Sequence, residues 1–347
     1  YYLDFESANW ISSEDYEKVI ARSSVEQWDI LYSMIGTIGN VYLEKNPVVD
    51  YACKNVGIFK FGGNCNKAYW MYYYLKSPQA MEFIKAHLRG TTQLYVPLAT
   101  LREMPVPVPD EEEMNKIVAI LRTLDDKIQC SIKINDNLLR QAQALYKNRF
   151  IDLKPFNGKM PPDWQLGTVS EIIELHDSKR IPLSSRERAN LTKIYPYYGA
   201  TSVMDYVDRY LFDGIYLLLG EDGTVVDDKG FPILQYVEGK FWVNNHAHII
   251  TGKNGFTVET LYLLFSLTNV RSIVTGAVQS KISQANLNNV SVVIPSKAEL
   301  STFNSIVQPI FSQIRNLRAE SDRLTSTRDI LLPRLMSGEI DVSDIQL

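Results

Sequence analysis

Asp227, Asp228 and Lys229 are the residues whose order best fits a catalytic site. Carboxylates followed by a lysine match the last part of a metal-dependent nuclease motif, in which the carboxylates bind Mg²⁺. The same residues lie between Gly223 and Gly230, and a polar segment bounded by glycines is typical of a hairpin. We therefore expect a hairpin here, and a metal-dependent nuclease is the alternative hypothesis.

His246 and His248 are the next candidates, for a metal site. If residues 246–250 form a strand, both side chains lie on one face and could share a metal ion. No third ligand lies nearby in the sequence, whereas a protein metal site needs at least three. We predict a structural role for the pair, beside a buried strand at Ile249 and Ile250, and no metal site.

Other catalytic motifs are absent from the sequence. A DNA methyltransferase needs a glycine-rich turn for its methyl donor and an Asn/Asp-Pro-Pro-aromatic motif. The nearest string, at residues 195–198, reads Tyr-Pro-Tyr-Tyr and lacks the amide or carboxylate that would hold the target base. The chain also lacks the GxxxxGK motif of nucleoside triphosphatases. We expect a non-catalytic protein without a cofactor.

A basic segment lies between Asp177 and Lys193 and contains one further acid, Glu187. Lysine and arginine suit contacts with DNA phosphates, and arginine can also read guanine in the major groove. The alternative is a solvated loop without a ligand. The candidate DNA contacts in this segment are Lys179, Arg180, Arg186, Arg188 and Lys193.

Small and polar residues follow at positions 197–202, and such side chains can approach base edges closely. The candidate DNA contacts here are Tyr197, Tyr198, Thr201 and Ser202.

The chain also contains an internal repeat, which indicates two units of the same kind. Gly90, Gln93, Leu101 and Pro109 recur without a gap, 186 positions later, as Gly276, Gln279, Leu287 and Pro295. Farther upstream, Gly36 and Gly39 match Gly220 and Gly223 at a shift of 184 positions.

Each repeated glycine opens a turn with polar side chains. Glutamine can bond adenine through two hydrogen bonds, while serine, threonine and lysine contact phosphates or bases. The glutamine could instead cap the strand that follows, and the sequence does not separate these roles. The candidate DNA contacts are Gln279, Ser280 and Lys281 in the second unit and Thr91, Thr92 and Gln93 in the first.

A long helix is predicted at the end of each unit. Apolar residues recur at alternating steps of three and four after Pro109, as in Ile117, Leu121, Leu124 and Ile128, and again after Pro295. Each stretch runs for roughly 38 residues, or about 55 to 60 Å. Gly338 is a plausible end of the second helix, and Pro333 is expected to kink or shorten its last turn.

These stripes are too long to be covered by a domain of ordinary size, so we predict that the two helices pack against each other. A pseudo-twofold repeat favours an antiparallel pair with one globule at each end, although a parallel pair remains open. Ser131 and Asn135 interrupt the first stripe, and Leu317 and Ser321 occupy the matching positions of the second. The polar residues are candidates for fixing the register.

The remaining pattern indicates mixed α+β globules. We predict strands at 104–108, 216–219, 241–243, 246–250 and 290–294, and short helices at 67–75, 79–88 and 257–267. Residues 154–164 contain Pro and Gly and are interpreted as the linker before the second globule.

Composition fits a globular protein of two domains, with 347 residues, 45% hydrophobic and 22% charged. A net charge of −4 argues against non-specific coating of nucleic acid, so any DNA contact must come from a local basic surface. Three cysteines far apart in the sequence fit a reducing compartment. With no long apolar run and no basic-then-apolar start, we expect a cytoplasmic protein without a membrane partner.

Taken in order, these motifs resemble the specificity subunits of type I restriction-modification enzymes. The resemblance covers nearly the whole chain. It rests on residues 160–164 (Met-Pro-Pro-Asp-Trp), on 196–199 (Pro-Tyr-Tyr-Gly), on 243–248 (Val-Asn-Asn-His-Ala-His) and on the repeated turn before Pro295. The chain departs from the family by carrying Glu112-Glu113 and Glu299-Leu300 where Glu-Gln is usual. The first globule also lacks about 20 residues at its start, relative to the second.

The resemblance implies an α+β fold with two similar mixed α/β target-recognition domains, separated by two long antiparallel coiled-coil helices. It implies domains at 1–109 and 153–295 and spacer helices at 110–152 and 296–347. The implied partners are double-stranded DNA with a bipartite site, two methyltransferase (M) subunits and restriction/motor (R) subunits. The helix pair would fix the gap between the half-sites. The alternatives are a stand-alone DNA-binding nuclease and a coiled-coil scaffold protein.

Overall fold

The computed structural model describes residues 3–276 and 278–345, and the chain divides into two compact units. Unit 1 comprises Tyr1–Ile132 and Ala319–Leu347, and unit 2 comprises Lys133–Arg318. Within the described residues, none of the helices combines the length and the apolar character that a membrane crossing requires.

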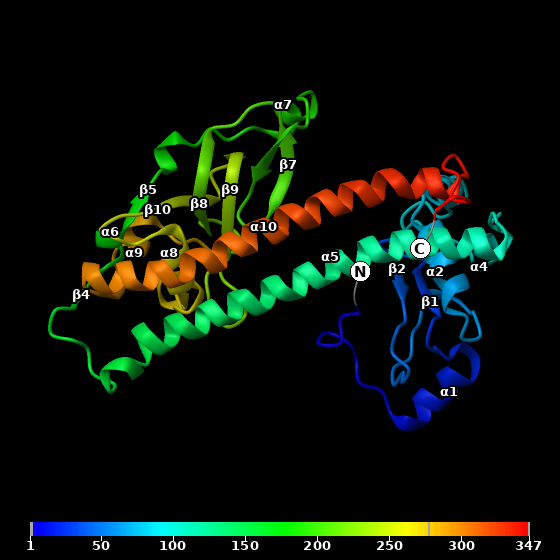
Figure 1. Cartoon of the computed structure of the whole chain (residues 1–347), viewed down its shortest axis with the longest axis horizontal. Coiled ribbons are helices and arrows are strands. Elements are labelled where there is room, and N and C mark those ends of the chain that lie inside the picture. Colours follow the sequence, from blue (N-terminus) through cyan, green and yellow to red (C-terminus); the bar gives the residue numbers. More distant parts are fainter. Residues whose placement is uncertain (1–2, 277, 346–347) are drawn as a thin grey trace. The chain divides into compact units, whose positions relative to one another are not determined.

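Two long helices, α5 (Glu111–Tyr146) and α10 (Lys297–Met336), confirm the predicted stripes and form continuous ribbons in Figure 1. Their starts repeat: Asp110 Oδ1 accepts a hydrogen bond from the Glu113 amide (2.9 Å), and Ser296 Oγ accepts one from the Glu299 amide (3.4 Å). Asp110 and Ser296 lie 186 positions apart, so the sequence repeat includes the residue that caps each helix.

The predicted end of α10 near Gly338 is confirmed, and the helix continues through Pro333. It ends at Met336, and Gly338 follows with a φ of 73°. Leu332, Leu335 and Met336 are buried in the core of unit 1. Their burial offsets the loss of one backbone hydrogen bond at the proline, which costs about 3 kcal/mol in a helix interior.

In unit 1 the two helices run antiparallel. Lys116 Nζ donates to the Ser343 carbonyl (2.7 Å), Asp125 pairs with Arg328 (2.7 Å), and Lys127 lies 3.5 Å from Glu320. Residues farther along α5 therefore contact residues nearer the start of α10, which is an antiparallel arrangement. Met114, Ile117, Val118 and Leu121 share the apolar core with the end of α10.

Unit 2 contains a second antiparallel contact, between the end of α5 and the start of α10. The ring of Phe303 lies edge-on to Tyr146 (5.7 Å between centroids) and Phe150 (4.8 Å), and Arg149 forms an ion pair with Glu299. The antiparallel direction, which the apolar stripes alone left open, is thus seen within each unit.

Unit 2 is built on a six-stranded sheet of order β5-β10-β8-β9-β6-β7, in which only the β6–β9 pair is parallel. Helix α8 packs on β8, β9 and β10. A second, two-stranded sheet pairs β4 with β11. The elements are η1 (Lys147–Ile151), η2 (Lys154–Phe156), β4 (Gln165–Thr168), α6 (Val169–Ile172), β5 (Ile173–Leu175), η3 (Asp177–Lys179), α7 (Ser185–Ala189), β6 (Tyr195–Tyr198), β7 (Val203–Val207), β8 (Phe212–Gly220), β9 (Leu234–Val243), β10 (Ala247–Gly252), α8 (Val258–Ser266), η4 (Arg271–Ile273), α9 (Gln284–Asn288) and β11 (Ser291–Ile294).

Unit 1 has a smaller sheet of order β2-β1-β3, with both pairs antiparallel, and its α2 helix is aromatic-rich and buried. The elements are α1 (Ser13–Ser23), β1 (Ile30–Ser33), β2 (Val41–Leu43), β3 (Val56–Phe59), α2 (Cys65–Leu75), α3 (Pro78–Ala86) and α4 (Leu98–Glu103). The predicted helices at 67–75, 79–88 and 257–267 are confirmed as α2, α3 and α8.

Two local predictions need correction. Residues 104–108 are not a strand: the matching β11 pairs with β4, the described part of unit 1 pairs no strand with this segment, and Pro105 and Pro107 lack an amide donor. Residues 154–164 form the short helix η2 and a packed turn instead of an extended linker. Trp164 is buried there against Phe150 (5.6 Å between ring centroids) and Phe156 (5.1 Å).

A tyrosine, a carboxylate and an arginine join the long helices to the rest of each unit. In unit 1, Asp125 on α5 accepts from the Tyr73 hydroxyl (3.0 Å) and pairs with Arg328 on α10. In unit 2, Glu259 on α8 accepts from the Tyr236 hydroxyl (2.7 Å) and lies 3.3 Å from Arg315 on α10. Burial and the neighbouring carboxylate raise the pKa of both tyrosines well above the ordinary value, so both hydroxyls remain hydrogen-bond donors.

Candidate nucleic-acid interface

The most closely repeated feature is a glycine turn, which we name by its closing pairs as the 89–95 turn of unit 1 and the 275–281 turn of unit 2. Gly90 and Gly276 have φ angles of 101° and 90°. A Cβ at either glycine would lie about 2 Å from a carbonyl oxygen, that of Gln93 (2.2 Å) or Gln279 (2.1 Å). Only glycine fits, which explains why both units carry a glycine at this position.

Each turn packs on the loop that follows a central strand. The Val96 amide donates to the Met34 carbonyl (2.8 Å) in unit 1, and the Ile282 amide donates to the Glu221 carbonyl (2.9 Å) in unit 2. Ser280 also accepts from the Gly223 amide through its carbonyl (2.9 Å). The turn therefore repeats at the predicted shift of 186 positions, whereas the loop repeats at a shift of 187. Met34 and Ile35 occupy the places of Glu221 and Asp222, so the predicted match of Gly36 with Gly220 and of Gly39 with Gly223 is wrong.

The turn side chains face solvent in both units. Thr91, Thr92, Gln93 and Gln279 are exposed, 46% of the Lys281 side chain is exposed, and Ser280 is half-buried. Ala277 lies outside the described residues. Exposed amide, hydroxyl and ammonium groups on a turn can form hydrogen bonds with a nucleic acid.

The basic segment 177–193 divides into inward and outward residues. Only 13% of Arg180 and 11% of Arg188 is exposed. Arg180 donates to Glu221 (2.5 Å) and to the Ala247 carbonyl (2.8 Å). Arg188 donates to Asp205 (3.0 Å) and stacks over the Tyr197 ring. These two arginines therefore bond within unit 2 and expose little surface for the predicted contact with DNA.

Lys179 and Arg186 are exposed and keep their predicted role as candidate phosphate contacts. Lys193 is 43% exposed, but its ammonium group donates to Asp205 (2.8 Å), which neutralises part of its charge. Asp205 has a pKa lowered to about 2 by hydrogen bonds from Lys193 and the Tyr206 amide, with a smaller one from Arg188.

The segment after it is similarly mixed. Tyr197 is 1% exposed, and its hydroxyl accepts from the Leu183 amide (2.9 Å), so its ring is part of the core and offers almost no surface to DNA. Tyr198 is half-buried and lies edge-on to Phe241. Thr201 and Ser202 are exposed in the β6–β7 turn, which is closed by a bond from the Gly199 amide to the Ser202 carbonyl (2.9 Å).

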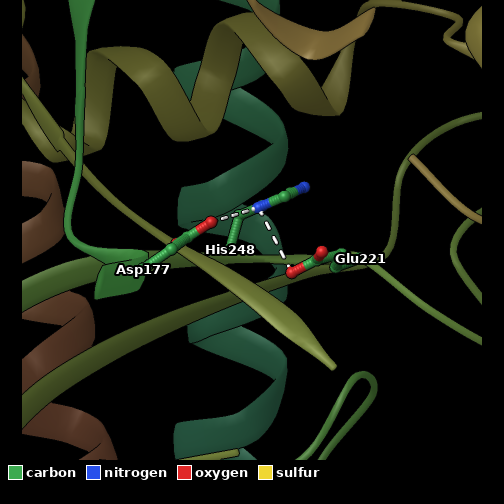
Figure 2. A group of neighbouring side chains, drawn as sticks. All are labelled: Asp177, Glu221 and His248. Atoms are coloured by element: carbon green, nitrogen blue, oxygen red, sulfur yellow. Dashed lines mark hydrogen bonds and ion pairs between the residues drawn. The ribbon is translucent and has the colours of Figure 1, made fainter. Parts of the chain in front are cut away.

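A buried charge network lies behind the 275–281 turn. Figure 2 shows Asp177 and Glu221 on either side of the His248 ring, with both dashed lines meeting at Nδ1. Nδ1 lies 2.6 Å from Asp177 Oδ2 and 3.6 Å from Glu221 Oε2, and Nε2 lies 2.8 Å from the Ile282 carbonyl. Carboxylates and carbonyls only accept, so both ring nitrogens act as donors.

Further donors complete the network around Asp177. Its Oδ1 accepts from the Ile249 amide (2.8 Å), and its Oδ2 accepts from Gln284 Nε2 (2.6 Å). Burial alone would raise the pKa of Asp177, but the hydrogen bonds from His248, Ile249 and Gln284 outweigh it and hold the pKa below the ordinary value. Asp177 is therefore an ionised, fully bonded carboxylate.

The ligand atoms of Asp177, Glu221 and His248 lie within 4.8 Å of one another, as in a metal site. Their protons and partners do not fit a metal ion. Both oxygens of Asp177 already accept hydrogen bonds, Arg180 occupies Glu221 Oε2, and Lys281 lies 3.5 Å from Glu221 Oε1. Arg180 and Lys281 beside the carboxylates supply the positive charge that a metal ion would otherwise bring. We assign an ion-pair network and no metal.

The histidine prediction is partly wrong. His248 lies on β10, but His246 precedes the strand, so the two do not share a strand face. The acid that completes the cluster, Asp177, is 71 positions away from His248. No sequence spacing indicates that contact, so Asp177, Glu221 and Gln284 were not predicted.

The acidic segment at Asp227 is a hairpin, as expected. Asp227 and Phe231 are joined by a backbone bond (2.9 Å), and Asp227 Oδ1 accepts from the amides of Lys229 (2.9 Å) and Phe231 (2.8 Å). The Asp227 carboxylate therefore stabilises the turn to which it belongs. Among the described residues it belongs to no cluster of three potential metal ligands, so the geometry does not favour the nuclease alternative.

Comparison with known proteins agrees with this architecture. Residues 4–140 and 161–326 match the family described as the type I restriction modification DNA specificity domain. The chain is 26% identical over 343 residues to the type I restriction enzyme MjaIX specificity subunit of Methanocaldococcus jannaschii, covering 91% of this chain and 78% of that protein. It is 22% identical to the HindI specificity subunit of Haemophilus influenzae, covering 92% of this chain and 88% of that protein.

The fold is also similar to a solved structure, the type I restriction-modification S subunit from M. genitalium. The TM-score is 0.55 at 18% identity, covering 90% of this chain and 83% of that one. Two repeated α+β units with exposed polar turns, and antiparallel long helices in each, define this class of protein. The chain belongs to the type I restriction-modification DNA specificity family, and its function is DNA recognition for such an enzyme.

Proposed function

We propose that this chain reads the two parts of a bipartite site in double-stranded DNA with its two repeated turns. The 89–95 turn of unit 1 would read one half-site, and the 275–281 turn of unit 2 would read the other. The repeated Gly-x-x-Gln turn carries this proposal, because both glutamines occupy the same exposed position on the same backbone. A glutamine amide can form two hydrogen bonds with adenine in the major groove.

Positive side chains support the proposal for unit 2. Lys179, Arg186 and Lys281 are exposed in a chain of net charge −4. Such a distribution provides local phosphate contacts without strong attraction to any nucleic acid. Thr201 and Ser202 add hydroxyl groups at the β6–β7 turn.

The partners follow from family membership. We infer that two methyltransferase (M) subunits and restriction/motor (R) subunits assemble with this chain in the cytoplasm and carry out the chemistry. We keep 1–109 and 153–295 as the target-recognition domains, with spacer helices at 110–152 and 296–347. The observed helices, α5 (Glu111–Tyr146) and α10 (Lys297–Met336), support these borders.

The test begins with methylation mapping of a genome that carries the complete system, which defines both half-sites. Binding of the assembled complex is then measured on duplexes in which one base at a time is changed. Gln279→Ala is expected to relax selectivity at one position of one half-site, and Gln93→Ala at one position of the other. Loss of a bidentate base contact costs about 1–3 kcal/mol of discrimination.

Gln165→Ala, at an exposed position of β4, is the matched control and leaves both half-sites unchanged. If Gln279→Ala and Gln93→Ala alter the same half-site, or neither, the assignment of one turn to each half-site is wrong. Cleavage of duplex DNA by the purified chain with Mg²⁺, abolished by Asp227→Ala, would instead support the nuclease alternative.

A further inference from the structure

The buried network of unit 2 connects two segments that carry candidate DNA contacts. Asp177 opens the basic segment 177–193, whereas Glu221 and His248 hold the end of the 275–281 turn. Glu221 accepts from the Ile282 amide through its carbonyl (2.9 Å), and its carboxylate lies 3.5 Å from the Lys281 ammonium. His248 donates to the Ile282 carbonyl and to Asp177.

In the described part of unit 1, apolar groups take the places of Glu221 and His248 beside the same turn. Met34 corresponds to Glu221, because each accepts the matching backbone bond from Val96 or Ile282. Gly57 then corresponds to His248, because Val56 pairs with Ser33 and Ala247 pairs with Gly220, one residue before each. A Cβ on Gly57 would lie 2.6 Å from Leu101 Cδ1 and 3.3 Å from Met34 Sδ, so apolar side chains fill this space in unit 1.

The comparison of the two units shows that the turn itself does not require a buried ion network. Replacing a buried ion pair by well-packed apolar groups is often neutral or stabilising, so the network is not explained by stability. In unit 2 the network links the 275–281 turn to the segment that carries Lys179 and Arg186. Asp177 and Arg180 belong to the basic segment and bond to His248 and Glu221. Glu221 and His248 in turn contact Lys281 and Ile282 at the end of the turn.

We propose that Asp177, Arg180, Glu221 and His248 are positioning residues that fix the 275–281 turn relative to the basic segment, so that unit 2 depends on this network for base selectivity whereas unit 1 does not. The inference rests on the proposed reading of one half-site by unit 2. It assigns no DNA contact to the four residues, which act through the exposed side chains that they hold in place.

The test uses the assembled complex and the half-site that Gln279→Ala identifies as belonging to unit 2. In the unaltered protein, a wrong base is expected to weaken binding by roughly tenfold or more. In Asp177→Asn, which removes the charge at constant size, the same wrong base is expected to weaken binding only about twofold. Discrimination at the unit 1 half-site stays unchanged.

Glu259→Gln is the matched control, because Glu259 belongs to an equally buried network in unit 2 that bonds Tyr236 and Arg315 instead of the turn. Both variants are expected to lower the thermal unfolding temperature. Only Asp177→Asn is expected to change discrimination. If both variants lose stability and neither changes discrimination, the network is merely structural and the inference is overturned.

Gln284→Ala keeps the test decisive if Asp177→Asn fails to fold. Gln284 is exposed at the start of α9 and donates one bond to Asp177, so its loss leaves the core intact. A smaller loss of selectivity, confined to the unit 2 half-site, supports the inference, and an unchanged selectivity with an intact fold contradicts it. Failure of the proposed function is distinct, because the unaltered complex would then show no base discrimination that Gln279→Ala changes.

Discussion

At the scale of single residues, the sequence is most informative where backbone geometry restricts the choice of side chain. Gly90 and Gly276 could be found from the repeat because any Cβ would meet a carbonyl oxygen about 2 Å away (2.2 and 2.1 Å). The basic segment was less informative. Its sequence does not show which arginines turn inward, and Arg180 and Arg188 bond to acids at positions 221 and 205.

Gly276→Ala tests the geometry of the turn. The substituted residue would face both an unfavourable positive φ and a close carbonyl oxygen, so the turn must rearrange. We expect a loss of about 1–3 kcal/mol in the free energy of unfolding, measured by chemical denaturation, together with weaker binding to the DNA site.

Gly239→Ala is the control for this substitution. Gly239 has a similar φ of 84°, but nothing lies within 4 Å of a Cβ built there. It is expected to cost only the conformational term, about 1 kcal/mol, and to leave DNA binding unchanged. Equal losses for both variants would show that the contact with the Gln279 carbonyl is unimportant.

At the scale of elements, the helices could be predicted because their apolar pattern is local. The relative direction of the two helices could not be settled from the apolar stripes, because the same stripe fits a parallel and an antiparallel partner. The strand predicted at 104–108 failed for a related reason. A strand needs a partner, which comes from a distant part of the chain. In unit 2, β4 is the partner of β11, and the described part of unit 1 provides no such partner for residues 104–108. The role of Ser131 and Asn135 in fixing register stays a prediction.

The ion pair between Asp125 and Arg328 allows a test of the helix contact in unit 1. The two side chains are only about one-fifth exposed and 2.7 Å apart, and Asp125 also accepts from Tyr73. In a double-mutant cycle with Asp125→Ala and Arg328→Ala, we expect a coupling free energy of about 1 kcal/mol or more. Chemical denaturation of the four proteins measures it.

Lys127 and Glu320 provide the comparison on the same helices. This pair is 3.5 Å apart and more exposed, so water screens the interaction. Its coupling free energy should be roughly 0.5 kcal/mol or less. Similar couplings for both pairs would mean that the buried network around Asp125 adds nothing to helix pairing.

At the scale of the whole molecule, each long helix contributes residues to both units, because the unit border falls within α5 and within α10. We propose that helix length sets the number of base pairs between the two half-sites. Deleting one heptad from each helix shortens it by about 10 Å, which equals roughly three base pairs.

The expected result is a change of about three base pairs in the tolerated gap, with both half-site sequences unchanged. Binding of the assembled complex to a series of duplexes with different gaps measures it. Deleting the heptad from one helix alone is the control, and it should weaken binding at every gap because the helix pair loses its register. A gap preference that survives the double deletion would contradict the proposal.

Unit 1 combines a segment that is synthesised early with one that is synthesised late. Its core includes Leu332, Leu335, Met336 and Val342, whereas the rest of that core lies before residue 122. Unit 2 is contiguous, from Lys133 to Arg318. On the ribosome, the unit translated first must therefore wait with part of its apolar surface uncovered until the final helix emerges, while the unit translated second can complete its fold earlier.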